Sequence, residues 1–272
     1  MAEELYDRTV YCEIGVPGEQ FRRFEDLRIS ARVRKGSESE PNSAEIDIFN
    51  VSADSISSAQ DEGAIARLFA GYSTPRLVFT GSINPGGATQ RKDGPDRVLE
   101  IEAKDGGRAF RSARINKTFD RGTRLAEVLD EIKGEIGLPE STIEVPEGAE
   151  LTQGVTLTGP IKDVLPRLNR SLNVEISIQD RTLQVLPPDG VAPDEAILVS
   201  SSPPNRNLIG EPRPTDDGRE VTALLDGRFL PGQRLRLESR RFEGLYRIVS
   251  LEHSLDSGWD QAFYSELTCR EI

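Results

Sequence analysis

The sequence predicts an α+β protein that is mainly β, with a small helix-containing module between two strand-rich regions. Segments within residues 8–103 alternate apolar and polar side chains, which is the period of a half-buried strand. Residues 123–172 change to apolar spacings of three and four, the period of an amphipathic helix. Residues 220–269 return to alternation. The chain has 272 residues, near the length at which one hydrophobic core stops growing, so two or three domains are expected.

The first strand-rich region is expected to span residues 1–112. Ser52 suits the N-cap of a helix of one or two turns, because Gly63 interrupts the apolar spacing that follows. Residues 84–95 are glycine, proline and polar residues, which predict a long hairpin tip or a mobile loop. The β-branched and alternating segments predict strands at 9–14, 27–33, 44–49, 77–81 and 97–103.

The middle region, residues 113–193, predicts two helices and a hairpin. Thr123 can cap a helix over 124–136, and Gly137 follows it at the usual C-terminal position. Pro160 suits the first turn of a second helix that runs to Leu172. Pro166 should kink that helix or mark a late start. The hairpin is expected over 173–186, with its turn at 179–181.

The last region, residues 194–272, begins with a predicted connector at 194–215 that its prolines stiffen. Turns are expected at Pro231-Gly232 and at 256–258. The alternation favours an antiparallel sheet or barrel with one wet face. Its expected strands are 220–225, 233–238, 244–254 and 259–269.

The charge balance is strongly acidic. Lysine and arginine number 34 against 46 aspartates and glutamates, a net charge of −12. Sequence-independent nucleic-acid binding needs a basic patch, and the basic runs here are as short as Arg32-Val33-Arg34-Lys35. The charge serves solubility, or forms a surface past which DNA slides if the chain lines a DNA conduit. No apolar run reaches about 20 residues, so no membrane insertion is expected. The acidic start indicates no secretory signal.

No catalytic residue, cofactor or metal is expected. His253 is the only histidine, and a zinc site needs about three protein ligands. The Gly-x-Ser-x-Gly motif of serine hydrolases does not occur. His253 is therefore interpreted as a structural strand-end histidine. Cys12 and Cys269 lie in strand-like segments and are expected to be buried, inert thiols.

Four aromatic residues stand out as candidate anchors of a core or a subunit interface: Tyr72, Phe79, Tyr246 and Trp259. Buried aromatic rings contribute large contact areas in both settings. For Tyr246 and Trp259, stacking against a sugar is a third interpretation.

A series of motifs runs along the whole chain in a characteristic order. Around its short helix the first region has Ile46–Ser52, Ala70-Gly71-Tyr72 and Phe79–Ile83. The middle region has Gly122–Leu125 and the hairpin Ile178–Val185. The last region has Leu208–Pro212, Leu230–Gln233, Gly244–Val249 and the strand pair through His253, Asp256-Ser257-Gly258 and Trp259. In this order the motifs resemble the baseplate hub of tailed bacteriophages, the late control protein D-like tail hub family.

The resemblance implies two tube-like antiparallel β-barrel domains flanking the small α+β module. It also implies a non-enzymatic structural protein of the virion tail baseplate, assembled in the host cytoplasm. Hubs of this kind form a homotrimer whose six barrels adapt the sixfold tail tube to a threefold spike. The implied partners are the tail tube protein, the central spike protein, and other baseplate and tape-measure proteins, with DNA passing through the channel without specific binding.

Two alternatives remain beside this resemblance. One is a hub-like component of a related contractile machine, such as a tailocin or a secretion system. The other is a secreted carbohydrate-binding β-sandwich protein, which would need an export signal and a cleft with paired acids.

Overall fold

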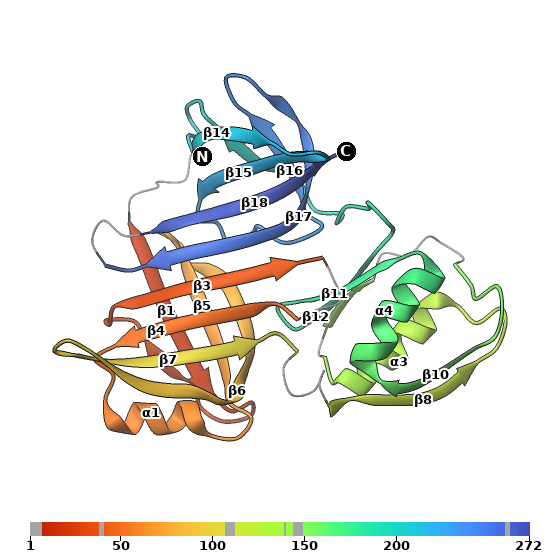
Figure 1. Ribbon diagram of the computed structural model, residues 1–272, viewed down its shortest axis with the longest axis horizontal. Coiled ribbons are helices and arrows are strands. Elements are labelled where there is room, and N and C mark those ends of the chain that lie inside the picture. The colour runs from red at the N-terminus through yellow and green to blue at the C-terminus, as the bar shows by residue number, and fades with distance from the viewer. Residues whose placement is uncertain (1–6, 38–40, 107–111, 139, 144–148, 259–261) are drawn as a thin grey trace.

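The computed structural model describes residues 7–37, 41–106, 112–138, 140–143, 149–258 and 262–272, without the side chains of 53–55 and 140–143. The mainly β fold class is confirmed, because one 13-stranded sheet dominates the molecule and a smaller α+β module lies to one side (Figure 1). Three clusters of buried apolar residues form its cores, drawn mainly from residues 10–103, 113–185 and 197–269.

The first barrel is built from the strands before residue 105 and one helix. Its sheet order is β3-β4-β7-β6-β5-β1-β2. In β3 the side chains of Ile29, Ala31 and Val33 are buried and those of Arg32 and Arg34 are exposed, as the alternation predicts. The elements are β1 (Arg8–Gly15), β2 (Arg22–Phe24), β3 (Ile29–Gly36), β4 (Ser43–Phe49), α1 (Ala53–Gln60), β5 (Ile65–Tyr72), β6 (Arg76–Asp93) and β7 (Asp96–Lys104).

Of the two expectations for residues 84–95, the long hairpin tip agrees with the structure and the mobile loop is wrong, because β6 continues to Asp93 and pairs with β7. The register of this pair shifts between Ile83 and Ala88, so the residues between them form a bulge. Gly86 lies in this bulge with a φ of 74°, a conformation that suits glycine. Only Gly94 and Pro95 separate β6 from β7. The glycine and proline residues therefore mark a bulge inside a strand rather than a loop.

The middle module packs two helices against short strands. Gly137 ends the first helix with a φ of 71°, as expected. The cap prediction is off by one residue: Arg124 is the N-cap, and the Thr123 hydroxyl donates to the carbonyl of Asp120 at 2.8 Å. The late start expected from Pro166 is wrong, because its helix begins at Ile161. The elements are β8 (Arg114–Phe119), α3 (Leu125–Ile136), β9 (Glu140–Ile143), β10 (Val155–Pro160), α4 (Ile161–Leu172), β11 (Glu175–Gln179) and β12 (Thr182–Leu186).

Residues 194–215 are predicted from the sequence to be a connector. This prediction is wrong, because two strands of the second barrel lie within these residues. One of these strands, β14, ends the large sheet, and an edge strand can hold prolines such as Pro212 and Pro214. The strands are β13 (Ile197–Ser200), β14 (Leu208–Pro214), β15 (Gly218–Leu224), β16 (Arg234–Glu238), β17 (Glu243–Asp256) and β18 (Phe263–Glu271).

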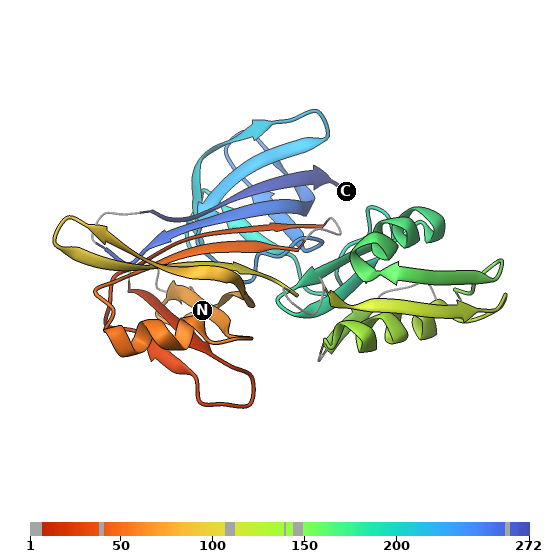
Figure 2. The same cartoon turned by 60° about the horizontal axis from the view of Figure 1, so that its bottom comes forward.

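The two barrels share a strand order and a single sheet. The order β3-β4-β7-β6-β5-β1 in the first matches β14-β15-β18-β17-β16-β13 in the second, in chain order as well as in space. The last half of β17 pairs with β3, from Ser250 opposite Gly36 to Asp256 opposite Ser30. The sheet thus passes from one barrel into the other without a break (Figures 1 and 2).

Candidate functional site

The outward side of the shared sheet forms one continuous polar face across both barrels. Six neighbouring strands contribute to it, in the order β15, β18, β17, β3, β4 and β7 (Figure 1). Because side chains alternate along each strand, the apolar residues fill the cores and the polar residues face outward. One row of directly paired residues crosses all six strands: Thr222, Glu266, Glu252, Arg34, Ser43 and Lys104. We call this outward side the polar face.

The polar face is acidic. It carries seven carboxylates against five basic groups, one of which reaches over from β6: Glu45, Asp47, Glu100, Glu102, Glu220, Glu252 and Glu266 against Arg32, Arg34, Lys104, Arg270 and, from β6, Arg91. Arg34 contacts Glu252 at 2.8 Å and Glu45 at 3.3 Å, so it bridges the two barrels. Within the described residues, Glu102, Glu220 and Glu266 form no ion pair, so their charges face solvent uncompensated.

The same face is hollowed along its length. Depressions of about 670, 370 and 330 Å³ lie over the β14–β15–β18–β17 strands, the β4–β6–β7 strands and the β3–β17 joint, respectively. Polar residues line most of each depression. The polar face therefore carries several open depressions that solvent can enter.

A buried polar cluster joins the α+β module to the first barrel. The tip of the β11–β12 hairpin, Asp180 and Arg181, has positive φ at both residues and reaches the ends of β3, β6 and β7. The fully buried Lys35 ammonium lies 2.5 Å from the Asp180 carboxylate, which also accepts from the Thr80 N–H at 3.2 Å. The Arg181 N–H donates to Asp105 at 2.8 Å. We call Lys35, Thr80, Asp105 and Asp180 the junction socket.

The junction socket holds two carboxylates and one ammonium, so its charges do not balance. Burial and the neighbouring Asp180 charge raise the pKa of Asp105 to about 7, although the Arg181 N–H and Lys35 act in the opposite direction. The Asp105 Oδ2 and Thr80 Oγ1 atoms are buried and accept or donate no hydrogen bond among the described residues. A proton on Asp105 relieves the charge imbalance.

Amide side chains extend this contact. Asn42 donates to the Ile178 carbonyl at 2.9 Å and to Gln179 at 2.8 Å, while Gln179 donates back to the Gly36 carbonyl at 2.8 Å. All of these side chains are buried. The amide groups of Asn42 and Gln179 each thereby find a partner across the contact, which fixes the hairpin against the barrel.

A second contact joins the α+β module to the second barrel. The Arg247 guanidinium on β17 is 1% exposed and forms a bidentate ion pair with Glu175 on β11. Arg270 on β18 pairs with Asp189 just beyond β12. The α+β module is therefore held by both barrels at once (Figure 2).

The structure places three of the four predicted aromatic anchors in the barrels. Phe79 is fully buried in the first core, and Tyr246 is buried in the second. Tyr72 lies where the barrels meet: its ring packs edge-on against Phe263 of β18, with centroids 5.2 Å apart. Trp259 lies outside the described residues. The anchors are thus dispersed and form no common site.

His253 and the two cysteines are buried. His253 lies within β17 rather than at its end, with Nδ1 2.7 Å from the Ser265 hydroxyl. Burial, followed by the nearby Lys35 charge, lowers the pKa of His253 to about 3, so the ring is neutral. Cys12 and Cys269 are buried, as expected, and burial raises the pKa of each thiol to about 12.

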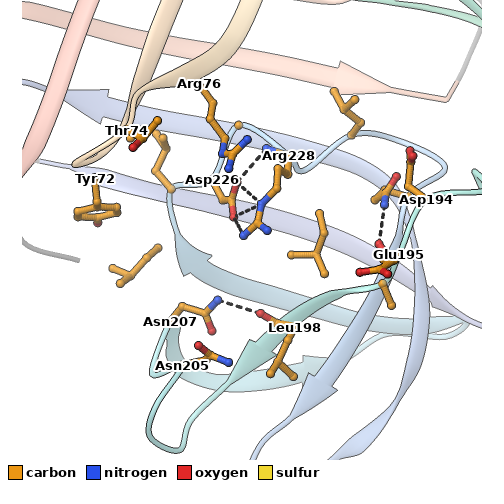
Figure 3. Close-up of a pocket in the computed structure, with 18 of the residues that line it drawn as sticks. Tyr72, Thr74, Arg76, Asp194, Glu195, Leu198, Asn205, Asn207, Asp226 and Arg228 are labelled. Carbon is orange, nitrogen blue, oxygen red and sulfur yellow. Dashed lines mark hydrogen bonds and ion pairs between the residues drawn. The ribbon is translucent and has the colours of Figure 1, made fainter. Parts of the chain in front are cut away.

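A further pocket lies between the barrels and holds about 650 Å³ (Figure 3). Its polar groups are occupied by the chain itself. Asp226 pairs with Arg228, and Asn207 donates to the Leu198 carbonyl at 2.9 Å. Among the described residues, no three histidine, cysteine, aspartate or glutamate side chains gather as metal ligands. In that same part of the chain, no helix is long and apolar enough to cross a bilayer.

The junction socket was missed in the sequence, although one signal for it exists. Lys35 continues the inward alternation of Ile29, Ala31 and Val33, so the pattern itself points its side chain into the core. A buried ammonium needs a carboxylate partner. That partner, Asp180, lies 145 residues away and has no sequence signal that connects it to Lys35.

Comparisons with known proteins identify the fold. No family model and no curated protein matches the chain. A 43 kDa tail protein of prophage MuSo2 from Shewanella oneidensis shares 10% identity, with 97% of this chain and 98% of that chain covered and a TM-score of 0.66. A tail protein from Neisseria meningitidis MC58 shares 12% identity over 98% and 97% of the two chains, with a TM-score of 0.67.

A third similar structure comes from a secretion machine. The E. coli c3393 protein is described as a type VI secretion component similar to the T4 phage tail proteins gp27 and gp5. It shares 12% identity over 95% of this chain and 76% of its own, with a TM-score of 0.60. At these identities the likeness concerns the fold. The chain therefore has the fold of phage tail proteins and of their type VI secretion relatives, as its motifs indicate for the tail hub family.

Proposed function

We propose that this protein is the structural baseplate hub of a phage tail, a homotrimeric ring that adapts the sixfold tail tube to a threefold spike. The observation that carries this proposal is the single sheet that runs through two barrels of identical strand order. Two such barrels in each chain give six pseudo-equivalent barrels in a trimer. Such a ring presents sixfold repeated surfaces to a tube while keeping the threefold symmetry that a spike requires.

The polar face suits the wall of the DNA channel. It extends across both barrels, it carries several depressions, and its carboxylates outnumber its basic groups by two. A surface that binds DNA neutralises phosphates with lysine and arginine and releases counterions. An acidic wall does the opposite, so DNA passes through the channel without being held.

In this proposal residues 1–112, 113–193 and 194–272 are the first barrel, the α+β module and the second barrel. The α+β module projects beside the barrels (Figure 1). This position supports a role for the module outside the channel wall, as a surface that other baseplate proteins contact. The tail tube, the spike and the tape-measure protein are the remaining partners. The hub has no catalytic role, and its site is the virion tail.

The mass of the purified protein in solution tests the proposal. Light scattering at several concentrations, alone and with the tube and spike proteins of the same source, should give three chains per particle. A chain that stays monomeric with every tail partner, and that binds or cleaves a polysaccharide, overturns the proposal.

The type VI secretion relatives support a second candidate, a hub-like component of a related contractile machine. The same ring would then sit in a tailocin or a secretion system rather than in a virion. Neighbouring genes distinguish the two: capsid and terminase genes accompany a phage hub, and their absence with effector genes present favours the secretion machine.

A further inference from the structure

Besides the outer edges of β2 and β13, two strand edges of the large sheet have no partner strand within the described residues. The first is β14, the terminal strand of the sheet. The second is the distal part of β6, residues 88–93, which pairs with β7 on one side, whereas β5 reaches only as far as Ser82 on the other. The β6–β7 hairpin and β14 lie at opposite ends of the molecule (Figure 1).

The matching strand order of the two barrels relates these two edges to the β3–β17 pairing, the joint between the barrels within one chain. By strand order, β14 corresponds to β3 and β6 corresponds to β17. Inside the chain, β3 lies along the distal half of β17, beyond the part of β17 that β16 covers. Each half of this joint therefore occurs a second time without a strand partner, as β14 and as the distal part of β6. At the start of that part of β6, the Gln60 amide of α1 donates to the Ala88 carbonyl at 3.1 Å, so the open edge comprises residues 89–93.

We propose that β14 of one copy lies antiparallel along residues 89–93 of β6 in the next copy, repeating the β3–β17 joint between subunits. This inference rests on the proposed function, because it names the contact that closes the ring. The occupant of each edge is a second copy of this chain. Since the two edges differ and lie at opposite ends, the contact is heterologous and closes only as a ring.

Matching the buried positions of the two repeats sets the register. Ala88 corresponds to Leu251, because both are buried and pair with buried residues, Ile101 and Leu267. This register places the bulge at 210–212, with Glu211 at its centre, opposite Lys92. Neither Glu211 nor Lys92 forms an ion pair within the described part of the chain. Their opposite charges complement each other across the joint.

Two further features of β14 fit the same partner. Ile209 is 41% exposed, one of three large apolar side chains exposed in the described residues, and the joint covers it with the tip of the β6–β7 hairpin. Arg213 approaches Arg91, whose charge is outweighed by Asp47, Asp93 and Glu100 around it. The local field that Arg213 meets is therefore acidic.

The prolines of β14 restrict what else can bind its edge. Pro212 and Pro214 have no N–H, so β14 makes fewer main-chain hydrogen bonds than β3 does. Prolines on an edge strand hinder pairing with arbitrary strands. Specificity for β6 then depends on the side chains named above.

Cysteine cross-linking tests the joint directly. Opposed residues of antiparallel strands have Cα atoms about 4.5–5.5 Å apart, within the range of a disulfide. The double variant Glu211→Cys with Lys92→Cys, oxidised in the presence of the tube and spike proteins, should form covalent dimers and trimers. Each single variant should not, and neither should the control pair Lys92→Cys with Glu127→Cys, since Glu127 lies on α3. Cys12 and Cys269 are buried and do not interfere.

A charge exchange gives an independent measurement on the same pair. Glu211→Lys or Lys92→Glu alone should raise the protein concentration at which half of the chains are trimeric by several-fold, and the two together should restore it. Lys162→Glu on α4 should change nothing. If the protein forms a trimer but the cysteine pair gives no cross-link and the charge variants do not change the trimerisation concentration, the β14–β6 joint is wrong, whereas the proposed hub function still stands. A chain that never trimerises overturns the proposed function itself.

Discussion

Asp105 is the side chain whose charge the fold disfavours most clearly. It is fully buried, it faces the carboxylate of Asp180, and the one ammonium nearby, that of Lys35, already pairs with Asp180. At pH 7 the carboxyl is therefore close to half protonated. The contact between the α+β module and the first barrel thereby depends on a proton.

This proton makes stability fall as the pH rises. The folded protein keeps the proton up to about pH 7, whereas the unfolded chain releases it near pH 4. Between these values the folded state binds more protons, so the free energy of unfolding decreases with pH, by a total on the order of a few kcal/mol. Asp105→Asn, which keeps the shape without the charge, should flatten this decrease. Urea unfolding from pH 5 to 8 measures it.

The matched control is Asp216→Asn, an exposed aspartate in the β14–β15 turn. It should keep the wild-type pH profile. A wild-type stability that stays level from pH 5 to 8, or an Asp105→Asn profile that still falls as steeply, would contradict the assignment of the proton to Asp105.

At the scale of elements, α4 lacks one main-chain hydrogen bond because it contains a proline. Pro166 lies six residues into the helix, where its ring replaces the N–H that would otherwise bond to the Lys162 carbonyl. Pro166→Ala restores that donor and should stabilise the protein by about 1–3 kcal/mol. Urea denaturation measures the change, with Lys162→Ala as a control that leaves the backbone bonding as it is. Unchanged or lower stability would mean that proline's restriction of the unfolded chain is the larger effect.

The sequence predicted those elements whose residues repeat with a clear period. The stripe of α3 and the alternation of β3 and β17 placed those elements correctly to within a few residues. Prediction from the sequence failed where glycine and proline occur inside a strand, as in the bulge of β6 and on β14. Local composition cannot distinguish such a strand from a loop, because the partner strand decides the outcome.

At the scale of the whole molecule, the proposed hub function predicts that the polar face governs how DNA moves through the particle. Changing Glu45, Glu102 and Glu266 to lysine reverses its charge without touching either core. We expect complete particles in electron micrographs that eject their DNA slowly, because cationic walls hold phosphates. Ejection triggered at two salt concentrations measures this, and higher salt should restore the rate.

The control for this prediction has the same charge change elsewhere. Glu127, Asp130 and Glu135 are exposed on α3, away from the polar face. Their replacement by lysine should leave ejection at the normal rate. Equal slowing by both sets of changes would show that total charge, rather than the polar face, controls the passage of DNA.

Sequence patterns also revealed the order of the modules but not the sheet that unites the barrels or the polar face that results. Arg34 and Glu252 bridge β3 and β17 from positions 218 residues apart, and neither strand carries a local signal of the other. The rows of the polar face can be traced only once that pairing is known.

The β3–β17 pairing also constrains how the protein is made. The N-terminal strand β3 emerges from the ribosome long before β17, so its edge stays open through most of translation. Long-range strand pairing of this kind folds slowly, and an open edge can pair with other nascent chains. Premature termination before residue 250 leaves that edge permanently exposed. We therefore expect copies that end before residue 250 to aggregate more readily than the full chain, because their β3 edge has no partner.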